Sequence, residues 1–154
     1  LRRVRFIQPA SRLWPCHPAT AYHSLMEPPI LHQLTVGLLA WALCNLMAAV
    51  AGLYWQPGKN ADFWRGFWFM NAIWGFIDGA IGWANLITGP VTIEFLRNVL
   101  AINSGLDLAY IATGVVLAIR VKPLLQGFGW AVILQGAFLL AFDLSFLILA
   151  MRQG

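Results

Sequence analysis

Four long apolar segments constrain the fold of this chain more tightly than any other feature. They cover residues 34–55, 66–87, 98–119 and 126–149. Each is longer than the ~18 residues that mark a candidate membrane-spanning helix. The first segment carries no charge, and the other three carry one charged residue each, Asp78, Asp107 and Asp143. This pattern predicts four transmembrane helices.

Composition indicates that the solvent of these helices is lipid. The chain is 60% hydrophobic and 10% charged, whereas a soluble domain carries about 25% charged residues. A soluble core of 154 residues could not hide so much apolar surface. We therefore expect a multi-pass membrane protein, with the lipid bilayer as its first partner.

The connections between the segments are short and rich in turn-forming residues. They lie at positions 56–60, 88–90 and 120–123. Asp62 is placed to cap the second helix, and Thr92 to cap the third. Short loops put consecutive helices side by side and antiparallel. The sequence thus predicts an all-α, up-down-up-down bundle of four helices with both termini on one side.

Residues 1–25 differ from the rest of the chain. They contain four arginines, three prolines and no acidic residue, and they lack the apolar region of an export signal. Met26 directly precedes the first apolar segment. We interpret residues 1–25 as a basic, disordered extension, with Met26 as a candidate true start, and residues 26–154 as the four-helix transmembrane domain.

The three aspartates are costly in lipid. A charged side chain at the bilayer centre costs roughly 2.5–3.5 kcal/mol on insertion scales. No lysine, arginine or histidine lies at the same depth to neutralise them. If the surroundings are dry, we expect at least one of Asp78 and Asp107 to be protonated at neutral pH.

Spacing along the helices places these acids together with several amides. Asn71, Asp78 and Asn85 are seven residues apart, which returns them to nearly one helix face. Asn45, Asp78, Asp107 and Gln135 each fall near the middle of a segment, so we expect a polar ring at mid-depth in which Asp78 faces Asp107. Asp143 and Asn103 should share a shallower layer. The candidate ligand- or proton-binding residues are Asn45, Asn71, Asp78, Asn103, Asp107, Gln135 and Asp143.

A purely structural role competes with this interpretation. Asparagine and glutamine in membrane helices mostly join helices, at roughly 0.6–2 kcal/mol per bond. A row of small residues in the third segment would let another helix approach closely: Ala101, Gly105, Ala109 and Thr113. The aspartates remain open between a structural and a functional role.

Several chemistries find no support in the sequence. The pattern offers no metal site, no cofactor and no catalytic residue. No histidine lies at membrane depth, which disfavours bis-histidine haem. Basic residues do not alternate with aromatic ones along a helix face, so nucleic acid is not expected as a partner. Cys16 and Cys44 lack metal spacing, and a disulfide framework is not expected.

Three motifs resemble a family of small, uncharacterised bacterial integral membrane proteins that carry a domain of unknown function. The first is Asn-Ser-Gly-Leu-Asp-Leu-Ala-Tyr-Ile at positions 103–111. The second is Gln-Gly-Ala-Phe-Leu-Leu at 135–140, followed by Phe142 and Asp143, and a looser third is Asn-Ala-Ile-Trp-Gly at 71–75. The resemblance implies a four-helix membrane fold in a bacterial inner membrane and supplies no activity or site residues.

Three classes of function stay open. The first is binding or transport of a proton, a cation or a small polar solute at the Asn/Asp/Gln cluster. A four-helix unit is small for a solitary transporter, so transport would require a homodimer. The second is a structural or assembly subunit that meets a membrane partner. The third and weakest is a lipid-modifying enzyme, because two acids without histidine, serine or cysteine at depth offer little chemistry. Binding stands slightly ahead of the second class.

Overall fold

The computed structural model describes residues 29–55, 60–88 and 91–153, and this part of the chain is helical with no strand. Its four helices are, in chain order, α1 (Pro29–Tyr54), α2 (Ala61–Ile87), α3 (Ile93–Ala118) and α4 (Pro123–Met151). The expected all-α class with four helices is confirmed. The interpretation of residues 1–25 as a basic extension concerns positions outside the described residues.

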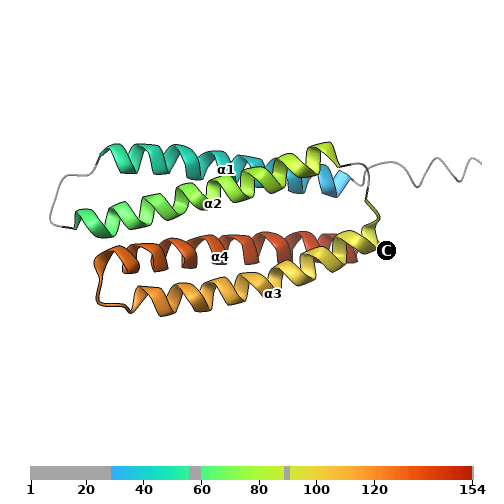
Figure 1. Cartoon of the computed structure of the whole chain (residues 1–154). Coiled ribbons are helices and arrows are strands. Elements are labelled where there is room, and N and C mark those ends of the chain that lie inside the picture. Colours follow the sequence, from blue (N-terminus) through green and yellow to red (C-terminus); the bar gives the residue numbers. More distant parts are fainter. Residues whose placement is uncertain (1–28, 56–59, 89–90, 154) are drawn as a thin grey trace, which may run out of the picture.

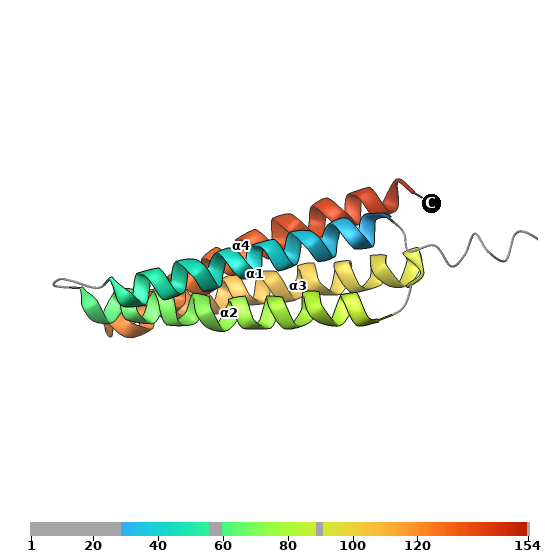
Figure 2. The same ribbon diagram turned by 90° about the horizontal axis from the view of Figure 1, so that it is seen from above.

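Consecutive helices run in opposite directions, so the start of α1 and the end of α4 lie at the same end of the molecule (Figure 1). The closest pairs are α1 with α2 and α3 with α4, and α2 and α4 join the two pairs. Within the described helices, α2 and α3 make no close backbone contact. Figure 2 shows α2 and α3 along one side, with α1 and α4 along the other.

Glycine allows α3 and α4 to approach closely. A Cβ atom on Gly114 would lie 2.9 Å from the Gly129 carbonyl oxygen and 2.8 Å from the Ile133 side chain. Only a residue without a side chain fits between helices at that separation. The row of Ala101, Gly105, Ala109 and Thr113 is exposed instead, and Gly105 has nothing within 4 Å.

Three of the four helices are long and apolar enough to cross a membrane: α1, α3 and α4. The prediction of four spans is thus supported for three helices, and α2 does not reach the same apolar character. That helix has the length, 27 residues, but its asparagines, glycines and tryptophans lower its apolar character. The segment boundaries were also too narrow, because each helix begins three to five residues before its predicted apolar segment.

The helix caps agree with the sequence at one position and differ at another. Thr92 caps α3, and its hydroxyl accepts a hydrogen bond from the Phe95 amide at 3.2 Å. Asp62 does not cap α2, because the N-cap position is Asn60 and Asp62 lies in the first turn. A carboxylate in that turn still interacts favourably with the positive end of the helix dipole.

Candidate functional site

One group of polar side chains forms a closed hydrogen-bonded network, here named the amide cluster: Trp41, Asn45, Asn71 and Gln135. Gln135 is 0% exposed and stands at its centre. Its Nε2 atom donates to Asn45 Oδ1 at 2.6 Å and to Asn71 Oδ1 at 2.7 Å, while its Oε1 accepts from Trp41 Nε1 at 2.8 Å. These bonds tie α1, α2 and α4 together.

The amide nitrogens of both asparagines in this cluster also donate hydrogen bonds. Asn45 Nδ2 donates to the Trp41 carbonyl at 3.0 Å, and Asn71 Nδ2 donates to the Phe67 carbonyl at 2.8 Å. Buried polar groups that are hydrogen-bonded in this way stabilise helix packing. The amide cluster is therefore a structural element of the fold.

The acids lie elsewhere, around a cavity of about 290 Å³ between the helices. We name it the acidic cavity. Asp78, Asp107 and Asp143 line it, one each from α2, α3 and α4, and leucines of α1 and α3 supply much of its apolar wall. Its other polar lining residues are Asn85, Asn103 and Tyr110.

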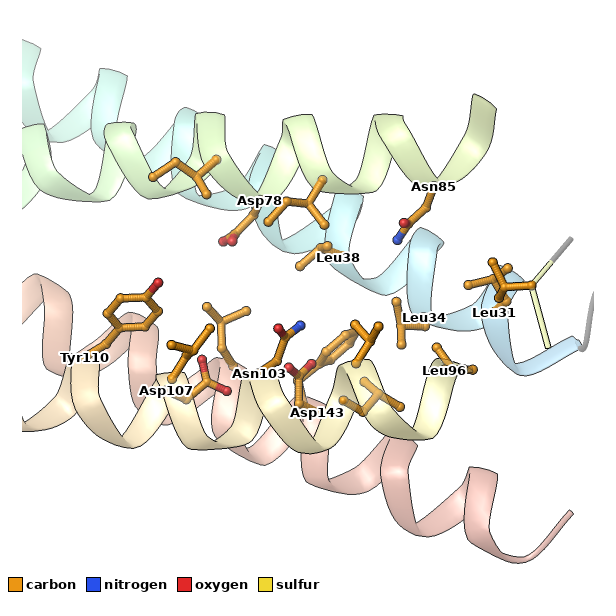
Figure 3. Close-up of a pocket in the computed structure, with 18 of the residues that line it drawn as sticks. Leu31, Leu34, Leu38, Asp78, Asn85, Leu96, Asn103, Asp107, Tyr110 and Asp143 are labelled. Atoms are coloured by element: carbon orange, nitrogen blue, oxygen red, sulfur yellow. The ribbon is translucent and has the colours of Figure 1, made fainter. Parts of the chain in front are cut away.

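Two of the three acids have an unsatisfied oxygen. Asp78 is 1% exposed and Asp107 is 3% exposed, and the Oδ2 atom of each is buried with no hydrogen-bond partner among the described residues. Figure 3 shows Asp78 reaching into the cavity from one side, with Asp107, Asn103 and Asp143 on the other. A buried carboxylate without a partner is destabilising, so these oxygens mark a place where the fold lacks a positively charged or hydrogen-bonding group.

The expected single ring at mid-depth is thus divided into two levels. The helices α2 and α4 run in the same direction, and Asn71 meets Gln135 at one level of the pair. Asp78 follows Asn71 by seven residues, which displaces it by about 10 Å along the helix axis. At that level it shares the cavity with Asp107 and Asp143. Asp143 therefore joins the other two acids, and Asn103 lies beside it (Figure 3).

Two further hydrogen-bond donors join the helices. Arg97 donates from two of its guanidinium nitrogens to the Ala150 carbonyl oxygen, at 3.0 and 2.7 Å. The role of Trp41 as a hydrogen-bond donor was missed. Its position four residues before Asn45, on the same helix face, was the available signal.

Metal binding is not supported by the spacing of the acids. In residues 29–55, 60–88 and 91–153, no three His, Cys, Asp or Glu side chains come close enough together to hold a metal ion. Asp78 reaches the cavity from one side, and Asp107 and Asp143 reach it from the other.

The fold and the site together define a class of protein: four helices, three of them apolar enough to cross a membrane, around an internal cavity lined by carboxylates. Residues 37–144 match a family of unknown function, DUF6992. The match covers more than half of the chain, and the chain belongs to this family. It includes all seven candidate site residues. No curated protein and no solved structure shows significant similarity to the chain.

Proposed function

We propose that this protein is an integral membrane protein that binds a cation or a small cationic solute in the acidic cavity. The observation that carries the proposal is the pair of buried, unpartnered oxygens of Asp78 and Asp107 beside open volume. A positive group placed there would supply the missing partner for both carboxylates. The amides of the amide cluster are already satisfied, so they belong to the scaffold.

Membrane insertion is the first part of the proposal. Large apolar side chains are widely exposed on the outer surface, including Leu43 at 61%, Met47 at 67% and Val50 at 68% on α1. Monomeric soluble proteins rarely expose contiguous apolar surface of this kind. A bilayer favours this arrangement, in which the acids face the interior of the bundle and the apolar side chains face outward.

Binding can be tested by thermal unfolding of the purified full chain in a nonionic detergent. The salts are potassium, methylammonium and choline chloride at equal ionic strength. A ligand that binds only the folded state stabilises it by about 2.7 kcal/mol at about 100 times its Kd. We expect at least one of these cations to raise the unfolding temperature of the native sequence, and Asp78→Asn and Asp107→Asn to lose that response.

Asp62→Asn is the matched control, because Asp62 is exposed on the same helix as Asp78 and lies outside the cavity. The Asp78→Asn variant should fold at least as well as the native sequence, since it removes a buried charge that has no partner. If no cation stabilises the native sequence, or if both cavity variants keep the full response, the proposed function is wrong.

A structural or assembly subunit is the second candidate. It is favoured by the exposed row of small residues on α3, Ala101, Gly105, Ala109 and Thr113, which no helix of the described chain covers. Under this alternative the acids serve only packing. This alternative would be supported if none of the three cations in the experiment above raises the unfolding temperature of the native sequence.

A further inference from the structure

The acidic cavity has a lateral opening between α2 and α3. These two helices make no close backbone contact within the described residues. The side chains on either side of the gap line the cavity and are also partly exposed: Ile77 at 42%, Ile81 at 49%, Phe95 at 56% and Leu106 at 47%. All four are apolar. The rim of the opening is therefore mostly apolar, with the phenol of Tyr110, also 36% exposed, as its polar member.

Packed side chains narrow the cavity at both ends along the helix axes. At the end near the chain termini, Leu31, Leu34, Leu96 and Leu100 belong to one buried apolar cluster, and a smaller pocket that shares Leu31 and Asn85 adjoins the cavity there. At the other end, Trp74 packs edge-on against Tyr110, with ring centroids 5.0 Å apart. A ligand thus reaches the acids more readily from the side than along the axis. In a membrane-spanning chain, that side faces the lipid chains.

The dimensions of the cavity favour a molecule over an ion. An apolar cavity of about 150 Å³ admits a ligand the size of benzene, and the acidic cavity measures about 290 Å³. Its wall combines three carboxylates with many aliphatic and aromatic side chains. A ligand that matches both kinds of surface has a positively charged head and an apolar body.

From the lateral opening, the apolar rim and the buried unpartnered carboxylates, we infer that the ligand is an amphiphilic amine that enters from the bilayer between α2 and α3. This inference rests on the proposed function and narrows its ligand class. The ammonium group lies against Asp78 and Asp107, and the apolar body lies along the leucine wall and passes the rim at Leu106. Octanol has an apolar chain but no positive charge for the carboxylates. Methylammonium has the charge but no apolar chain for the leucine wall.

The experiment measures binding of octylammonium, methylammonium and octanol to the full chain in lipid nanodiscs by calorimetry, with empty nanodiscs as the blank. We expect octylammonium to bind at least about tenfold more tightly than methylammonium, a difference of about 1.4 kcal/mol. Octanol should give no heat beyond the blank. Asp78→Asn should weaken octylammonium binding by about tenfold or more.

Two variants on α3 test the route of entry. Leu106→Trp narrows the opening and should reduce octylammonium binding while methylammonium binding persists. Ile102→Trp is its matched control, because Ile102 is 64% exposed and does not line the cavity, and it should change neither.

The outcomes separate this inference from the proposed function. Equal binding of methylammonium and octylammonium, or full octylammonium binding by Leu106→Trp, would overturn the amphiphile and leave cation binding intact. If octanol binds as tightly as octylammonium, the ligand does not need a positive charge and the inference is overturned. If neither amine binds, both the inference and the proposed function are wrong.

Discussion

Replacing Gln135 with leucine should destabilise the fold more than any other single change in the amide cluster. Gln135 is fully buried and makes three hydrogen bonds to side chains of α1 and α2. Leucine has a similar volume, so the cavity contribution is small, and the loss is chiefly that of hydrogen bonds. Trp41 Nε1 would lose its acceptor, and Asn45 Oδ1 and Asn71 Oδ1 would lose their donor.

The magnitude follows from the number of bonds. Hydrogen bonds between membrane helices average about 0.6 kcal/mol and reach about 1.7 kcal/mol. Three such bonds give a loss of roughly 2–5 kcal/mol in the free energy of unfolding. The upper part of this range applies if the groups left behind find no new partner, because unsatisfied buried polar atoms add about 1–3 kcal/mol each.

The measurement is reversible unfolding in mixed micelles, followed by tryptophan fluorescence as the fraction of denaturing detergent rises. Gln126→Leu is the matched control on the same helix. Its amide donates a single exposed bond, to the Arg120 carbonyl at 2.8 Å, and its loss should cost less than about 0.5 kcal/mol. If Gln135→Leu is no more destabilising than Gln126→Leu, the amide cluster does not hold the helices together and its assignment to the scaffold fails.

Two further predictions concern packing and membrane insertion. Gly114→Ala should destabilise the chain by roughly 1–3 kcal/mol, because its Cβ would collide with the Gly129 carbonyl; Gly105→Ala, with open space around it, should stabilise the helix by up to about 1 kcal/mol. The same unfolding assay compares the two, and equal effects would contradict the close α3–α4 contact. Cys44 is an exposed free thiol in the middle of α1. In a Cys16→Ser background it should resist a membrane-impermeant maleimide in intact membranes and react after solubilisation in denaturant, whereas rapid labelling in intact membranes would argue against α1 as a span.

Helix number and order were readable from the sequence because apolar segments of spanning length alternate with turn-forming residues. Thr92 was likewise identifiable as a cap, since capping depends on a local hydrogen bond. The exception is α2, where an apolar segment with a single charge predicted a span. Its asparagines and glycines make contacts with neighbouring helices, as Asn71 and Gly75 show. The same residues lower the apolar character of the helix.

The sequence also predicts the candidate residues within each single helix. It does not predict which residues of different helices lie together. Periodicity places Asn71 and Asp78 on one face of α2, and it says nothing about which of them reaches Gln135. The offset between α2 and α4 decides that question, because it sets Asn71 against Gln135 and Asp78 level with Asp143. A shift of one helix by two turns would have exchanged acids for amides in the cavity.

The sequence by itself determined four helices, their order and the presence of three costly carboxylates, since these depend on local composition and chain connectivity. Only the tertiary structure decided that the amides satisfy one another while the acids are left around an open space. That division arises from the relative offset and separation of helices, which result from packing contacts such as Gly114 against Gly129. The tertiary structure also determines the position of the lateral opening. Helix α2 packs against α1 and α4, and α3 packs against α4, whereas α2 and α3 make no close backbone contact within the described helices.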